Sequence, residues 1–239
     1  MRLLFSLLFL LSFTLLQANN NAIEYPTLPS KAEKIEDFIP SGWKLLTEAR
    51  GDLNNDSRND VVFVIESIEK LNSDFEDGNS YNVRIVGIAL WNFRDGVFEL
   101  VVQSNDFIPT TEGNPAITED PLESILIKNG TARFYFHYID NGQLYITDQT
   151  FVFYYNKNQF ELGGYVRSKL HRSTQAYTRE SLNYSAGKGT LLKRNNDSEI
   201  GATSDVNFTP DKKYNLATIG KARLFKPQEI KYSEFAGTY

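Results

Sequence analysis

Residues 51–60 gather oxygen-bearing side chains at a spacing that suits the binding of a hard cation. Within the sequence Gly-Asp-Leu-Asn-Asn-Asp-Ser-Arg-Asn-Asp, these side chains belong to Asp52, Asn54, Asp56 and Asp60. Three carboxylates so close in the chain repel one another unless a positive charge offsets them. Ca²⁺ accepts about six to eight oxygen ligands in a flexible geometry, and the backbone carbonyl of Arg58 could supply a further one. The sequence therefore predicts a site in this loop with Ca²⁺ as the bound metal.

Other metal sites fit the segment less well. Zinc sites are built largely from Cys and His, and the loop has neither. An EF-hand loop ends in a bidentate Glu and lies between two helices. This loop instead has Phe63 at the corresponding position and runs into the strand-like segment Val61–Ile65. A polar hairpin turn without metal remains the alternative, because Asn and Asp also favour tight turns.

The loop resembles the calcium loop of FG-GAP repeats, the strand-loop-strand units of integrin-like propellers. That family has the pattern Asp-x-Asn-x-Asp-Gly-x-x-Asp, and the side chains named above match it position by position. The resemblance implies a strand on each side of the loop and a bound calcium ion. Ser57 replaces the family's Gly where a left-handed turn is needed, at a cost of about 1–2 kcal/mol, so we expect weak affinity. Propeller blades repeat about every 40 residues, and this chain has the motif once, so we expect a single unit.

The first 18 residues have the composition of a secretory signal peptide. Arg2 provides the basic start, Leu3–Leu16 the apolar run and Leu16-Gln17-Ala18 a cleavage site. A helix that spans a bilayer needs about 20 apolar residues, and this run is shorter, so we expect cleavage near Asn19 and no membrane span. Since the chain has no cysteine for a disulfide or a lipid anchor, the sequence predicts a periplasmic or secreted protein.

The charge balance and the missing motifs narrow the function. The net charge is −5, and losing the single charge of Arg2 with the signal peptide takes it to −6, which disfavours nucleic acid as a partner. The sequence contains no nucleophile elbow, zinc-protease motif or phosphate-binding loop. We therefore expect a monomeric, non-catalytic binding or structural protein of the cell envelope, whose partner is a protein or a glycan. Hydrolysis of an envelope polymer by paired carboxylates is the alternative.

From residue 82 onward, runs of β-branched and aromatic residues alternate with turn signals, which is the pattern of successive hairpins. The turn signals are Asp95-Gly96, Asn129-Gly130, Asn141-Gly142 and Asn156-Lys157-Asn158. The expected strands are Trp43–Ala49, Val61–Glu66, Val83–Phe93, Val97–Ser104, Ser124–Lys128, Thr131–Ile139, Leu144–Tyr155 and Gln159–Ser168. The sequence therefore predicts an all-β fold, an antiparallel meander of hairpins that forms a sandwich or a half-open barrel.

Aromatic residues alternate along two of the expected strands. The rows are Phe134, Phe136 and Tyr138 on the first strand and Phe151, Phe153 and Tyr155 on the next. Residues two apart share one face of a strand, so we expect these rows to pair across the sheet and to face the core. Tyr135 and His137 lie on the opposite face, where they are candidates for contact with a glycan.

The rest of the chain is more polar. Residues 19–40 contain three prolines and predict a polar N-terminal arm, with at most a short helical turn around Ala32–Phe38. Residues 41–171 form the expected β-meander core domain with the calcium loop, and residues 172–239 a polar β-hairpin extension or a partly mobile tail. Weaker strands are expected at Thr190–Lys193, Ala202–Phe208 and Ala222–Phe225. A solvated loop is expected at Ser67–Ser80, and its acidic residues, the weaker candidates for a second cation site, are Asp74, Glu76 and Asp77.

The order of motifs from Ile39 to Ser168 resembles a group of small exported bacterial proteins with no assigned activity. The shared features are a strand that begins at Gly-Trp, the Gly-Asp-Leu-Asn loop, and the segments Trp91–Gly96 and Val101–Asn105. This resemblance implies export and a calcium-type loop, and it supplies no catalytic residues.

Overall fold

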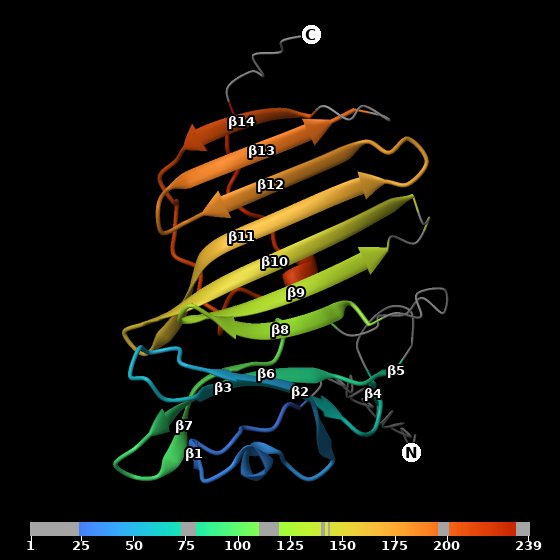
Figure 1. Cartoon of the computed structure of the whole chain (residues 1–239). Coiled ribbons are helices and arrows are strands. Elements are labelled where there is room, and N and C mark those ends of the chain that lie inside the picture. The colour runs from blue at the N-terminus through green and yellow to red at the C-terminus, as the bar shows by residue number, and fades with distance from the viewer. Residues whose placement is uncertain are drawn as a thin grey trace, which may run out of the picture.

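The chain folds into two main antiparallel sheets that share one core (Figure 1). The computed structural model describes residues 24–72, 80–109, 120–139, 142, 144–195 and 201–232. Helical structure within these residues consists of two 3-10 turns, η1 (Ile35–Phe38) and η2 (Ala222–Leu224). No helix in this part of the chain has the length and apolar character needed to cross a membrane. The prediction of an all-β fold is confirmed, and the two open sheets are consistent with a sandwich.

The five-stranded sheet has the order β1-β7-β6-β3-β2. Its strands are β1 (Lys31–Ala32), β2 (Trp43–Gly51), β3 (Asp60–Ser67), β6 (Arg84–Asn92) and β7 (Val97–Ser104). β3 is paired on both sides and buried on both faces, because Val62 and Val64 enter the shared core while Phe63 and Ile65 enter a second cluster. This double burial explains why the strand is a continuous apolar run rather than an alternating one.

Residues 24–40 cover the second face of the five-stranded sheet. β1 pairs with β7, and Leu28, Ile35 and Phe38 are buried, with the Phe38 ring stacked on that of Phe63 at 5.4 Å between centroids. η1 lies within the range predicted for a short helical turn. The sequence indicates a polar arm, but its described part is a packed cover, because its buried apolar residues enter the second cluster.

The seven-stranded sheet runs from β8 to β14 in chain order, so each strand pairs with the next (Figure 1). Its strands are β8 (Leu122–Lys128), β9 (Thr131–Ile139), β10 (Tyr145–Asn156), β11 (Gln159–His171), β12 (Tyr177–Asn183), β13 (Lys188–Arg194) and β14 (Ala202–Asn207). Positive φ angles occur at both central residues of two of its turns, 52° and 67° at Asn129-Gly130 and 47° and 63° at Lys157-Asn158. These are the two-residue turns that match strand twist, and the predicted meander is confirmed.

Several of the sequence predictions fall outside the described residues or next to them, and the predicted signal peptide at residues 1–18 lies wholly outside them. A small sheet pairs β4 (Leu71–Asn72) with β5 (Ser80–Tyr81) at the two ends of the predicted solvated loop. The candidate second cation site at residues 74–77 and the first residue of the Asn141-Gly142 turn lie outside the described residues.

Phe107 lies at the centre of the shared core. It is fully buried in the segment that follows β7, and the centroids of four surrounding phenylalanine rings are 5.1 to 5.7 Å from its own. Those rings belong to Phe134, Phe136, Phe151 and Phe153. The prediction that these phenylalanines of the two aromatic rows face the core is confirmed, and the residue that they enclose comes from a connecting segment.

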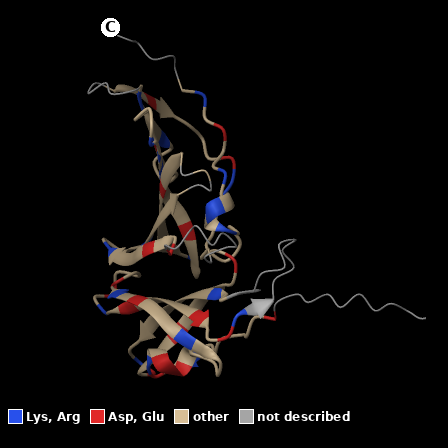
Figure 2. Ribbon diagram, turned by 90° about the vertical axis from the view of Figure 1, so that its right-hand side faces the viewer, with Lys and Arg blue, Asp and Glu red and all other residues tan. Residues whose placement is uncertain are grey.

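After β14 the chain returns across the inner face of the seven-stranded sheet as an extended segment, the C-terminal strap (residues 208–232). The backbone N–H of Leu162 donates to the carbonyl of Tyr214 and that of Leu216 to Phe160, each at 2.9 Å. η2 lies behind β9 and β10 in Figure 1, and Figure 2 shows the strap along one side of the sheet. Three weak strands are expected after residue 172. Two of them form as β13 and β14, and the third is the 3-10 turn η2, which packs on the sheet.

A buried arginine on β6 binds β3 and also the two residues that flank 110–119, Pro109 and Asp120. Arg84 is only 4% exposed, and its guanidinium donates to both carboxylate oxygens of Asp120, at 2.7 and 2.6 Å. It also donates to Glu66 Oε1 at 2.9 Å and to the carbonyl of Pro109 at 3.0 Å. The bonds to Asp120 and Glu66 are among the stronger ones in proteins because both partners are charged.

Candidate metal-binding loop

The predicted loop joins β2 to β3, so a strand lies on each side of it. It packs against the β8–β9 turn, where a Cβ atom added at Gly130 would lie 3.3 Å from Asn55 Oδ1. A Cβ atom added at Gly51 would lie 2.7 Å from Cγ2 of Ile127, so the two sheets approach each other closely at the base of the loop. The neighbouring hairpin therefore supports the loop from one side.

Three of the predicted ligands fold around the same short stretch of backbone. The carboxylate of Asp52 accepts hydrogen bonds from the N–H groups of Asp56 and Ser57, at 3.2 and 2.8 Å. Asn54 Oδ1 also accepts from the Asp56 N–H, at 3.1 Å, and Asp56 Oδ1 accepts from the Arg58 N–H at 2.9 Å. The side chains of Asp52, Asn54 and Asp56 are thereby brought together.

The left-handed turn predicted at Ser57 is present, with φ of 65°, and Asn55 has φ of 63°. Asn adopts this conformation more readily than Ser, because its side chain can hydrogen-bond locally. The folded loop therefore already carries the cost of the turn at Ser57 before any cation binds. This strain lowers the stability of the loop and has little effect on its affinity for a cation.

Asp60 has a different role from the other predicted ligands. It is fully buried, and its two carboxylate oxygens accept the backbone N–H groups of Trp91 and Leu53, at 2.9 and 2.8 Å. Burial raises the pKa of Asp60, the charges of Asp56 and Asp52 raise it further, and the two backbone hydrogen bonds oppose the shift. Asp60 thus fixes the base of the loop to β6.

The predicted ligand set is only partly assembled. Within the described ranges, no group of three or more His, Cys, Asp or Glu residues has the arrangement of a metal site, so Asp60 does not join Asp52 and Asp56. The donors that do lie together are all oxygen atoms, which suits Ca²⁺. Arg58 lies beside them in the loop, where its N–H binds Asp56, and its carbonyl stays a predicted ligand.

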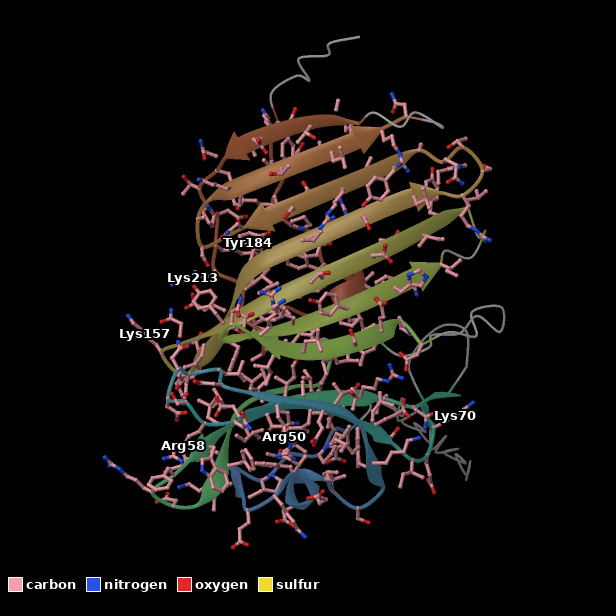
Figure 3. All side chains as sticks on the ribbon, viewed as in Figure 1. Arg50, Arg58, Lys70, Lys157, Tyr184 and Lys213 are labelled. Carbon is pink, nitrogen blue, oxygen red and sulfur yellow. The ribbon has the colours of Figure 1, made fainter. Side chains whose placement is uncertain are left out.

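The carboxylates of this loop have no cationic partner in the described part of the chain. The two nearest arginines in the sequence are engaged elsewhere, because Arg50 pairs with Glu48 at 2.8 Å and the Arg58 guanidinium lies 3.9 Å from the centroid of the Phe93 ring. Figure 3 shows Arg50 and Arg58 on the five-stranded sheet side of the molecule. Like charges in close proximity raise the energy of the loop, and a bound cation would lower it.

The two candidates on the opposite face of β9 are partly engaged. His137 Nδ1 lies 2.8 Å from Asp148 Oδ1, and Ser168 Oγ donates to Asp148 Oδ2 at 3.0 Å. This three-strand cluster was not apparent in the sequence, because it needs the register of β9, β10 and β11. Its serine and histidine bind the aspartate from two sides and do not bind each other, which differs from a serine nucleophile with its base. Tyr135 is half-buried.

Two pockets lie along the C-terminal strap. The first, of about 240 Å³, is lined by residues of β10, β11, the β12–β13 turn and the strap, and its one carboxylate is Glu161. The second, of about 210 Å³, is lined by strap residues and contains no carboxylate. A hydrolase of the predicted alternative type needs two carboxylates facing one substrate, and neither pocket provides them. Sequence patterns gave no sign of either pocket, because the strap lacks regular periodicity.

Comparison with protein-family models, with curated proteins and with solved structures finds no match in any of the three. The resemblance of the loop to FG-GAP repeats therefore stays a prediction.

Proposed function

We propose that the protein is an exported, calcium-binding β-domain that acts as a non-catalytic binding or structural protein of the cell envelope. One observation carries the calcium part: Asp52, Asn54 and Asp56 lie together around the backbone amides of residues 56–58, without a cationic partner among the described residues. Export rests on the signal-peptide pattern of residues 1–18.

Asp52, Asn54 and Asp56 would hold the ion through their side-chain oxygens, and the Arg58 carbonyl remains a candidate ligand. Calcium supplies positive charge that offsets the carboxylates and links the two halves of the loop. Asp60 would act as the anchor of the loop, since both its oxygens bind backbone amides. With few protein ligands, the remaining coordination positions would be filled by water. Weak binding follows, with a dissociation constant of about 10⁻⁴ to 10⁻³ M, as in many extracellular modules.

A binding role is favoured over hydrolysis by the content of the two pockets, neither of which pairs carboxylates. The face of the seven-stranded sheet opposite the strap is open in Figure 1 and offers a broad surface for an envelope protein or glycan. Tyr135 and His137 lie on that face, on β9. We expect the protein to be a monomer that uses this surface.

Calcium titration by calorimetry tests the proposal. For the mature chain we expect a single weak site, and Asp52→Asn should weaken it at least about tenfold, because it removes one of the charges that face the ion. Glu48→Gln is the matched control, since Glu48 is a carboxylate on β2 that already pairs with Arg50, and it should leave the affinity unchanged. Absence of calcium heat in the wild type, or equal affinity in Asp52→Asn, would contradict the proposal.

A further inference from the structure

The C-terminal strap carries a charge opposite to that of the whole chain. Residues 208–232 contain six basic and two acidic residues, whereas the chain as a whole has a net charge of −5. The basic residues are Lys212, Lys213, Lys221, Arg223, Lys226 and Lys231, and the acidic ones are Asp211 and Glu229. Figure 2 shows blue segments along the strap on one side of the sheet. A local excess of positive charge on an acidic protein favours an anionic ligand at this place.

Part of this charge surrounds a pocket. The pocket of about 210 Å³ has Lys212, Lys221 and Lys226 on its walls, together with Thr218. Its other lining residues are Tyr214, Ile219, Leu224 and Phe225. Neither acidic residue of the strap lines it. The pocket therefore combines three ammonium groups with an aromatic and aliphatic surface.

The pocket is preformed by contacts on both of its sides. Tyr214 is held to β11 by the hydrogen bond from the Leu162 N–H, and the Phe225 ring packs on those of Tyr214 and Tyr165, at 5.2 and 5.0 Å between centroids. Gln228 links the two ends of the strap, because it accepts from the N–H of Asp211 and donates to the carbonyl of Thr209. A ligand would therefore bind without a large cost of ordering the chain.

The neighbouring pocket shares Lys212 and Tyr214 with this one but differs from it by containing a carboxylate. There the Glu161 carboxylate accepts hydrogen bonds from Tyr154, Asn156 and Lys213, with Lys213 Nζ at 3.1 Å. One of the two lysines that line it, Lys213, is therefore paired with its carboxylate. In the second pocket, Lys212 Nζ lies 4.8 Å from the centroid of the Tyr214 ring, and this contact leaves its charge without an acidic partner among the lining residues.

We propose that this pocket binds a small organic phosphate, a phosphate ester on a body of about the size of a sugar. Lysine ammonium groups bind phosphate as point charges, without the bidentate geometry that arginine offers to carboxylates and phosphates alike. The apolar floor would contact the organic body, and the volume, below the usual range of about 300–1,000 Å³, limits its size. The phosphate could belong to a free sugar phosphate or to a phosphorylated envelope glycan. This site does not depend on the calcium loop.

The test is calorimetric titration of the mature chain at low ionic strength with glucose 1-phosphate, inorganic phosphate and glucose. We expect glucose 1-phosphate to bind most tightly and glucose not to bind. Lys212→Gln and Lys226→Gln should each weaken binding roughly tenfold, because each removes a charged hydrogen-bond donor. Lys213→Gln is the matched control: it removes the same charge from the adjacent residue, which pairs with Glu161, and should change the affinity less than about twofold.

Three outcomes would overturn the proposal. The first is equal binding of glucose and glucose 1-phosphate. The second is an equal loss of affinity in all three lysine variants, which would indicate nonspecific attraction. The third is binding to vesicles of phosphatidylglycerol, and not to those of phosphatidylcholine, without binding of glucose 1-phosphate, which would assign the surface to a membrane. Asp56→Ala should bind glucose 1-phosphate normally, so this result separates the pocket from the calcium loop.

Discussion

Replacing Phe107 with alanine is expected to lower the free energy of unfolding by about 3–5 kcal/mol, the usual range for a buried phenylalanine. Phe107 is fully buried, and its ring contacts the rings of four other phenylalanines on β9 and β10. Removing the ring leaves a cavity that these rigid strands can fill only partly. The loss should therefore lie in the upper part of the range.

Urea denaturation followed by circular dichroism measures the effect of Phe107→Ala. Phe93→Ala is the matched control, because Phe93 is 66% exposed, and it should cost less than about 1 kcal/mol. A Phe107 variant that unfolds at the same urea concentration as the Phe93 variant would show that the shared core does not depend on this ring.

Replacing Arg84 with methionine is the second change with a large expected effect, again about 3–5 kcal/mol. The guanidinium is the partner of Glu66 and Asp120 and the donor to the Pro109 carbonyl. Without it, Glu66, whose side chain is 12% exposed, keeps the exposed Lys44, at 3.2 Å, as its one ionic partner in the described part of the chain. Removal of one member of a buried ion pair is costly because the remaining charge lies away from water.

The same denaturation measurement tests Arg84→Met. Lys44→Met is the control, because Lys44 is the exposed partner of Glu66 and its loss should cost less than about 1 kcal/mol. Adding Glu66→Gln to Arg84→Met should recover part of the stability, since it removes the buried charge. No recovery in this double variant would contradict the electrostatic explanation.

The hairpin meander could be predicted because residues that lie close together in the sequence specify each turn and each strand. Turns such as Asn129-Gly130 need positive φ angles that few residues adopt, and the aromatic alternation fixes which face of β9 and β10 is buried. Long-range pairings carry no such pattern. The two residues of β1, the ring of Phe107 and the strap acquire their places only from the packing of distant segments.

The candidate metal-binding loop likewise combines features that the sequence predicts with one that it does not. The position of the loop between two strands follows from local sequence, and the left-handed turn at Ser57 is what the resemblance to FG-GAP loops implies. The role of Asp60 does not, because alternation from Val62 and Val64 places it on the core face of β3, where it binds the Trp91 amide of β6. Spacing alone suggests a metal ligand, and only the pairing of β3 with β6 reveals an anchor.

Thermal melting with excess Ca²⁺ and with a chelator, at matched ionic strength, tests the calcium proposal most directly. Ligand at about 100 times its dissociation constant stabilises the folded state by about 2.7 kcal/mol, which for a chain of this size raises the melting temperature by about 5 °C or more. The wild type should show this difference and Asp56→Ala should lose it, because the variant lacks one of the clustered carboxylates. If both proteins melt at the same temperature with and without Ca²⁺, the loop is a polar turn that binds no calcium.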